Sequence, residues 1–312
     1  MANVQLGLKR AMVSKNKVSI AHLERRCSGF FLDSGGHSLY TIHEIVPKHV
    51  NDYGWYKSKE FVAYIDRYCE YVKANLDGID HYAVVDVIFR PDLTWQVQKY
   101  MEDRHGLNPV PVLHYNTPLK WFDKYLEAGY DYLGVGGLGQ EAPYAVYSKW
   151  ADRVFDHICP GPSRLPAVRT HGFAMTSWRL LTKYPWWSVD SSSWCKGAGY
   201  GLLFVPHKRG GRFTIDEPPY MIFCSYRTKQ KGKKGRTIET LSKGERAVVF
   251  EWLEKIGIPY GRVGENGEPV EKGVLTDYNS AARANLLFFQ AMADALPPWP
   301  WPFRGRPKQG FW

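Results

Sequence analysis

Two aspartates, Asp33 and Asp190, each end a short apolar run and precede small, turn-forming residues. Asp33 is followed by Ser-Gly-Gly and Asp190 by three serines. An aspartate at the carboxyl end of a buried strand can face a ligand directly, and two such carboxylates in one barrel can divide nucleophilic and acid/base work at a sugar carbon. Taken singly, each aspartate also fits a strand-end residue that caps its own turn through backbone N–H groups.

Asp86 lies in an apolar run, where an unpaired carboxylate is costly to bury. Its partner is either a buried basic side chain or the N1–H and exocyclic amine of a bound guanine. His114 ends another apolar run, where it is either a satisfied core histidine or part of a site. The stretch 134–139 lacks the spacing of a nucleotide P-loop. Its glycines would still let backbone N–H groups approach a flat ligand closely.

Strand-like and helix-like segments alternate between residues 28 and 195, which is the βα pattern of a parallel sheet. The predicted strands span residues 30–33, 81–87, 110–114, 131–136, 167–171 and 186–190. The predicted helices span residues 58–76, 92–105, 118–128, 143–158 and 177–183. Two further strands, at 4–8 and 220–225, would close a (β/α)8 barrel of the TIM type. We favour this α/β fold over an open doubly wound sheet because polar residues end nearly every strand.

The regular pattern stops after Trp194, and three parts are predicted. Residues 1–195 form the main part of the barrel, and residues 196–240 form a basic insertion on its rim. Residues 241–312 supply C-terminal helices that complete the barrel and a tail rich in Pro and Trp. Ser242 and Glu245 have the spacing of a capping box for a helix at 242–256, and a second helix is predicted at 279–295. The proline-rich residues 297–303 are expected to lie extended on the surface.

The chain of 312 residues has a net charge of +10 and a pI of about 9.2, which favours a polyanionic partner. Much of the positive charge is concentrated in one region, where we expect contacts to nucleic-acid phosphates from Lys208, Arg209, Arg212, Lys229, Lys231, Lys233, Lys234 and Arg236. The odd number of cysteines, 5, and the lack of a signal segment or membrane span favour a reduced cytoplasmic setting. Cys195, His207 and Cys224 match no familiar metal-ligand spacing, so no metal is expected.

Taken together, five features in order resemble the queuine and archaeosine tRNA-guanine transglycosylases. More closely, they resemble the phage and bacterial relatives that insert 7-deazaguanines into DNA. These features are the turn Asp33-Ser34-Gly35-Gly36, Asp86, Gly136-Gly137-Leu138, Glu141 and Asp190. The resemblance covers residues 29–195, somewhat over half of the chain.

The resemblance implies base exchange through a covalent glycosyl-enzyme, without a cofactor. It makes Asp190 the nucleophile and Asp33 the general acid and base. The base would be held by Ser34, Asp86, His114, Gly136, Gly137, Leu138 and Glu141. His114 stands about where the family has a glutamine. A phage-encoded member would act in the host cytoplasm, on a guanine that is flipped out of the duplex or already single-stranded.

Two departures from the family favour DNA over tRNA. The tRNA enzymes follow their nucleophile with Cys-Val-x-Pro-Thr-Arg, where this chain has Ser191-Ser192-Ser193-Trp194, and they carry a zinc subdomain that this chain lacks. The same chemistry on tRNA stays open as an alternative. So do a (β/α)8 glycoside hydrolase, whose carboxylates also lie at strand ends, and a non-catalytic nucleic-acid-binding subunit.

Overall fold

The computed structural model describes residues 3–5, 29–42, 54–136, 144–175, 177–226 and 236–303. The chain divides into two compact units, which we name the sheet unit and the hairpin unit. The sheet unit comprises Gln5–Met175, Lys183–Ser191 and Trp299–Trp312, and the hairpin unit comprises Met1–Val4, Thr176–Thr182 and Ser192–Pro298. The segments predicted as a basic insertion and as C-terminal helices therefore belong largely to one unit.

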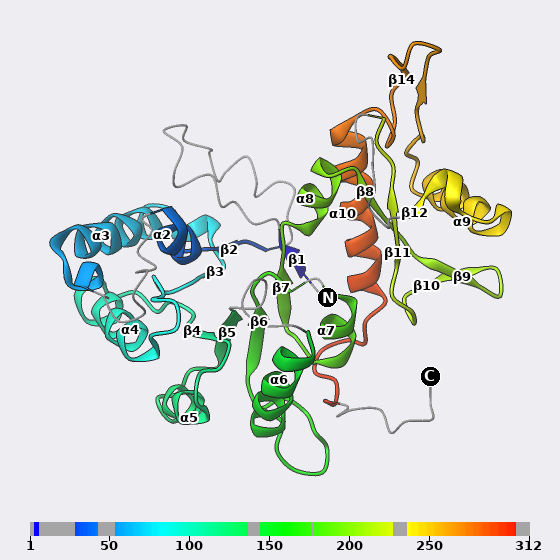
Figure 1. Ribbon diagram of the computed structural model, residues 1–312. Helices are drawn as coiled ribbons and strands as arrows, with labels where there is room; N and C mark the ends of the chain where they lie inside the picture. Colours follow the sequence, from blue (N-terminus) through cyan, green and yellow to red (C-terminus); the bar gives the residue numbers. More distant parts are fainter. Residues whose placement is uncertain are drawn as a thin grey trace. The chain divides into compact units, whose positions relative to one another are not determined.

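Six parallel strands of the sheet unit lie side by side in the order in which the chain visits them (Figure 1). They are β2 (Phe31–Leu32), β3 (His81–Tyr82), β4 (Val112–His114), β5 (Tyr132–Gly136), β6 (Arg169–Gly172) and β7 (Ser188–Asp190). A single parallel bridge between Ala83 and Val110 joins β3 to the segment that leads into β4. A doubly wound sheet reverses its strand order, and these six described strands show no reversal.

Helices connect these strands, as the alternating pattern predicts. They are α2 (Gly36–Ile42), η1 (Gly54–Lys57), α3 (Lys59–Lys73), η2 (Leu76–Gly78), α4 (Pro91–His105), α5 (Leu119–Glu127) and α6 (Tyr144–Ile158). Ser58 caps α3 by accepting a hydrogen bond from the Phe61 N–H, and the helix buries one apolar stripe, including Ile65 and Val72, in the core. Helix α7 (Trp178–Lys183) follows β6 in the chain.

The sheet is strongly curved, because side chains from strands that are not neighbours meet on one face. Phe31 of β2 stacks on His171 of β6 with ring centroids 4.3 Å apart. Four strand spacings separate β2 from β6, so in a flat sheet the two would lie about 19 Å apart. Phe31 also meets Tyr132 of β5 edge to face at 6.1 Å. The curved face therefore encloses an interior, lined by alternate residues of each strand.

Three expectations need correction. The strand predicted at 81–87 ends at Tyr82, and 84–87 continue as a buried segment without ladder partners beyond Val84, so Asp86 lies past the strand end. The strand predicted at 220–225 does not join the parallel sheet; it pairs antiparallel with Leu202–Val205. The tail residues Trp301 and Phe303 are buried rather than on the surface, because Phe303 stacks on Tyr184.

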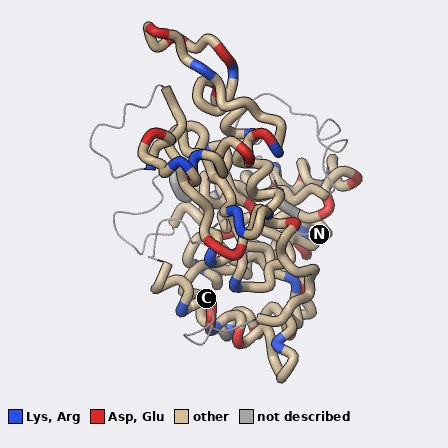
Figure 2. The backbone as a smooth tube through the Cα atoms, turned by 90° about the vertical axis from the view of Figure 1, so that its right-hand side faces the viewer, with Lys and Arg blue, Asp and Glu red and all other residues tan. Residues whose placement is uncertain are grey.

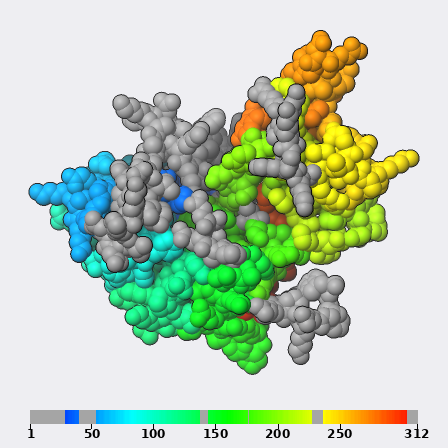
Figure 3. Space-filling view, viewed as in Figure 1, coloured from blue at the N-terminus to red at the C-terminus, as the bar shows by residue number. Residues whose placement is uncertain are grey.

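The hairpin unit is built on a small sheet of β8 (Leu202–Val205), β11 (Tyr220–Phe223) and β12 (Arg236–Thr237), with a hairpin of β9 (His207–Arg209) and β10 (Arg212–Thr214). Its helices are most of α7, together with α8 (Ser193–Gly199), η3 (Ile238–Thr240), α9 (Lys243–Lys255) and α10 (Tyr278–Asp294). Buried Asn285 of α10 binds the backbone of Trp194, Leu202 and Phe204, and so ties α10 to α8 and β8. The ribbon of β13 (Arg262–Val263) and β14 (Pro269–Glu271) projects above α9 in Figure 3.

The two predicted C-terminal helices are confirmed as α9 and α10, and Ser242 and Glu245 form the predicted capping box. Of the strand predicted at 4–8, β1 (Asn3–Gln5) covers the start, and residues 6–8 lie outside the described residues.

Candidate functional site

Asp33 follows β2 directly and opens the predicted turn. Its Oδ1 accepts a hydrogen bond from the Gly35 N–H at 3.3 Å, and Gly35 has a φ of +78°, which glycine adopts without strain. The Tyr64 hydroxyl of α3 donates to the Ser34 carbonyl at 2.7 Å, which fastens the turn to the helix. The turn therefore holds Asp33 at the carboxyl end of its strand.

Ser34, Asp86 and His114, which are far apart in the sequence, form one buried hydrogen-bonded cluster. The Ser34 hydroxyl donates to Asp86 Oδ1 at 3.1 Å, and His114 Nε2 lies 2.9 Å from Asp86 Oδ2. The side chains of Asp86 and His114 are only 10% and 5% exposed. Asp86 thus has protein partners for the carboxylate that its apolar surroundings would otherwise penalise.

The Asp86 carboxylate packs directly against Gly36, the first residue of α2. A Cβ at residue 36 would overlap the carboxyl carbon and both carboxylate oxygens of Asp86. The second glycine of the turn is therefore required by a close side-chain approach, whereas the first is required by its backbone conformation.

Tyr64 reports the electrostatics around this cluster. Burial first, and then the nearby Asp33 and Asp86 carboxylates, raise the pKa of its phenol to about 12. The phenol therefore stays protonated and continues to donate to the Ser34 carbonyl. Since both carboxylates act on the same phenol, Asp33 and Asp86 belong to one electrostatic neighbourhood.

Asp190 ends β7, and backbone groups of the loop after β6 hold it. The Ala174 N–H donates to Asp190 Oδ1 at 2.7 Å, and the Met175 N–H donates to the Asp190 carbonyl at 2.8 Å. Ala174 has a φ of +56°, a conformation that is uncommon for a residue with a side chain. The Asp190 side chain is 13% exposed, so most of it lies inside the curved sheet.

The stacked pair of Phe31 and His171 links the surroundings of Asp33 and Asp190. Asp33 follows Phe31 by two residues, directly after the last residue of β2. His171 Nε2 lies 3.7 Å from Asp190 Oδ1. The Asp190 carboxylate is therefore next to this aromatic pair, and Asp33 lies two residues along the chain from Phe31.

Gly136 ends β5 beside this cluster. A Cβ there would lie 3.8 Å from His114 Cδ2 and 3.6 Å from the Phe173 Cβ, so the strand end is flanked by two rings. The other predicted base contacts, Gly137, Leu138 and Glu141, lie outside the described residues.

The sequence reasoning missed Tyr64, Phe173 and Ser188 as neighbours of the site and gave His171 no role in it. A usable signal exists for the last three. Residues 169, 171 and 173 alternate along β6 and its extension, and residues 188 and 190 alternate along β7, so each set shares the interior face. No such alternation identifies Tyr64, because it lies in helix α3 and not in a strand.

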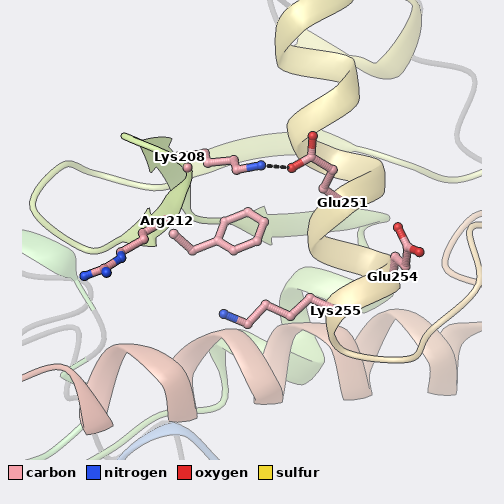
Figure 4. Close-up of a pocket in the computed structure, with 7 residues that line it drawn as sticks. Lys208, Arg212, Glu251, Glu254 and Lys255 are labelled. Atoms are coloured by element: carbon pink, nitrogen blue, oxygen red, sulfur yellow. Dashed lines mark hydrogen bonds and ion pairs between the residues drawn. The ribbon is translucent and has the colours of Figure 1, made fainter.

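The predicted phosphate contacts in the hairpin unit are mostly paired with acids. Lys208 forms an ion pair with Glu251, Arg236 with Glu245, and Arg209 binds Glu217 through two hydrogen bonds of 2.6 and 2.8 Å. Figure 4 shows Arg212 pointing away from the glutamates of α9, and it has no ion pair among the described residues. The remaining predicted contacts lie outside the described residues: Lys229, Lys231, Lys233 and Lys234.

The charge of this unit is accordingly balanced where the structure describes it. Residues 177–182, 192–226 and 236–298 contain twelve basic and eleven acidic residues, and Figure 2 shows the two signs interspersed. Beside the Lys208–Glu251 pair lies a pocket of about 590 Å³, lined by Arg212, Phe213 and Lys255 among others (Figure 4). The excess positive charge predicted for this region is carried by residues 227–235.

Within the described ranges, no three His, Cys, Asp or Glu side chains are grouped as a metal site. Cys195 instead donates to the Ser192 carbonyl, His207 stacks on Tyr220, and burial raises the pKa of the Cys224 thiol to about 12. None of the described helices has the length and hydrophobicity needed to span a membrane.

Comparisons with protein-family models, with curated proteins and with solved structures found no match.

Proposed function

We propose that this protein exchanges guanine in DNA for a 7-deazaguanine, on a sheet that closes into a (β/α)8 barrel. One observation carries the proposal. Three carboxylates lie at the end of a strand of one curved parallel sheet or in the segment after it, and each accepts a hydrogen bond: from Gly35 to Asp33, from Ser34 to Asp86 and from Ala174 to Asp190. Active sites of (β/α)8 enzymes lie at this end of the strands.

Asp190 is assigned the nucleophilic role. Its carboxylate attacks C1′ of the target nucleotide, and the C1′–N9 bond breaks with its electron pair passing to guanine. Asp33 gives its proton to the leaving base. In the second half of the reaction Asp33 takes a proton from the incoming deazaguanine, whose N9 attacks C1′ and releases Asp190. One pocket serves both bases in turn, so the kinetics should be ping-pong.

Asp86 and His114 are assigned to the base edge. A carboxylate has about four acceptor positions, and Ser34 and His114 occupy two of them, so the N1–H and amine of guanine can still be accepted. His114 is held by the same carboxylate and would contact the base beside it. The Gly136 backbone, which carries no side chain, gives a flat base close access to this end of β5.

DNA is preferred as the polymer because the chain lacks the zinc-ligand pattern of the tRNA enzymes. The target base must leave the stack, at a cost of a few kcal/mol, before it reaches the interior of the sheet. Cations of residues 208–236 would contact the phosphates, with Arg212 the best placed of the described ones because it has no acidic partner among them.

The test is incorporation of labelled guanine and of 7-deazaguanine bases into duplex DNA, single-stranded DNA or tRNA, followed by mass spectrometry of the nucleosides. We expect label in DNA with the wild type and none with Asp190→Ala, which should still bind DNA. Asp77→Ala, which removes an exposed carboxylate of η2, is the matched control and should behave as the wild type. Exchange that persists in Asp190→Ala would remove Asp190 from the nucleophilic role, and label only in tRNA would reassign the polymer.

A further inference from the structure

His171 is held rigidly inside the curved sheet. Its side chain is 1% exposed. Phe31 covers one face of the ring in a near-parallel stack, with an interplanar angle of 13°, and Phe173 meets it at 76° with centroids 4.5 Å apart. These two aromatic contacts fix the plane of the imidazole and therefore the directions of its two nitrogens.

A chain of hydroxyls determines which nitrogen carries the proton. Nδ1 of His171 lies 2.6 Å from the Ser188 hydroxyl, which lies 2.5 Å from the Tyr132 hydroxyl. Burial raises the pKa of Tyr132, so its phenol keeps its proton, and the described residues offer it no other acceptor. Tyr132 therefore donates to Ser188. The arrangement that gives the Ser188 hydrogen an acceptor as well is the one in which Ser188 donates to Nδ1. A neutral ring in this chain carries its own proton on Nε2.

The Nε2 atom points at the proposed nucleophile. It is buried and has no hydrogen-bond partner among the described residues, although Asp190 Oδ1 lies 3.7 Å away. A buried donor without a partner is uncommon and costly. Oδ1 is also the oxygen that accepts the Ala174 N–H. A small approach of the two side chains would add a second donor to the same oxygen.

We infer that His171 is a positioning residue that holds Asp190 Oδ1 while the covalent intermediate breaks down, an inference that rests on the proposed function. In that step N9 of the incoming base forms a bond to C1′, and the bond from C1′ to Asp190 Oδ2 breaks. The electron pair returns to the carboxylate, and Asp33 takes the proton from the base. Negative charge therefore grows on Asp190, where the Nε2–H and the Ala174 N–H stabilise it.

Two substitutions of His171 distinguish the contribution of Nε2 to the reaction from that of Nδ1. In His171→Gln the terminal amide reaches the Nε2 position and keeps a donor toward Asp190, whereas in His171→Asn the amide reaches only the Nδ1 position. Removing one donor to transition-state charge costs about 10²- to 10³-fold in kcat. We expect His171→Asn to lose about 10²-fold in kcat with little change in KM for guanine, and His171→Gln to stay within about 10-fold of the wild type.

The covalent adduct gives a readout that a structural role would not change. After rapid denaturation during turnover, the fraction of protein linked to DNA should rise in His171→Asn, since breakdown is slowed, and stay low in His171→Gln. If both variants fail to fold, Ser188→Ala provides a third test, because it removes the hydroxyl that favours the proton on Nε2. This variant should lower kcat by about 3- to 10-fold and raise the adduct fraction.

Asp190→Ala separates the two proposals. If it is inactive while His171→Asn turns over as the wild type without extra adduct, the role of His171 is wrong and the proposed function stands. Equal losses in His171→Asn and His171→Gln would also overturn it, because they would indicate packing alone. If Asp190→Ala exchanges bases normally, the proposed function fails and this inference fails with it.

Discussion

Replacing Gly36 with alanine tests how firmly the Asp86 carboxylate is held. The added Cβ overlaps that carboxylate, which can move aside only by weakening its bonds to Ser34 and His114, of 3.1 and 2.9 Å. Hydrogen bonds to charged groups contribute about 1.5–3 kcal/mol each, and alanine in a helix returns about 1 kcal/mol relative to glycine. We therefore expect Gly36→Ala to lower the free energy of unfolding by about 2–5 kcal/mol.

Denaturant unfolding measures this change, with Gly244→Ala as the matched control. Gly244 also lies in the first turn of a helix, α9, but a Cβ there would meet nothing within 4 Å, so this variant should be neutral or stabilised by up to about 1 kcal/mol. In an Asp86→Ala background the clash is gone, so Gly36→Ala should no longer be destabilising and should behave like Gly244→Ala. An equal cost in both backgrounds, or a midpoint like that of Gly244→Ala in the wild-type background, would refute the reasoning.

Two further predictions concern pH and salt. The pKa of Tyr64 is raised from 10.0 to about 12 by burial first and by Asp33 and Asp86 next. Its contribution to stability is therefore complete below pH 10 and is lost as the pH rises toward 12. Between pH 10 and pH 12 the free energy of unfolding of Tyr64→Phe, measured in denaturant, should fall by about 2–3 kcal/mol less than that of the wild type. The same pH dependence in both proteins would contradict the assignment. Arg212→Ala should reduce the salt slope of DNA binding by about 1, whereas Arg209→Ala, whose cation is already bound to Glu217, should change it less. A salt slope that equals the wild-type value in both variants would exclude this surface from DNA contact.

Local signals in the sequence predicted the helices well, because a helix is specified by residues close together in the chain. Ser58 caps α3, and Ser242 with Glu245 caps α9, at the residues where the capping signals stand. Strand ends were predicted less well. The apolar run after Tyr82 is compatible with a buried strand and with a buried irregular segment. Only the pairing with a neighbouring strand distinguishes the two.

Tyr220–Phe223 shows the same limit at the level of topology. Its composition suits a strand of any sheet, and its antiparallel partner, β8, was not predicted as a strand. The ion pairs of the basic region were also beyond local reasoning, since Glu251 is 43 residues from the Lys208 that it binds. The types of the site residues were readable from the sequence, whereas the contact of Phe31 with His171 depends on the curvature of the whole sheet.

The carboxylates differ in how they are held, and the difference follows the roles proposed for them. Asp33 accepts a backbone N–H of its own turn at 3.3 Å. Asp190 receives a backbone donor from another loop at 2.7 Å and has an imidazole nitrogen 3.7 Å from the same oxygen, which fixes the direction of its carboxylate. Asp86 is bound on both oxygens by side chains, which favours recognition over chemistry. The sheet can therefore give three identical side chains three environments, because each follows a different strand and meets a different loop.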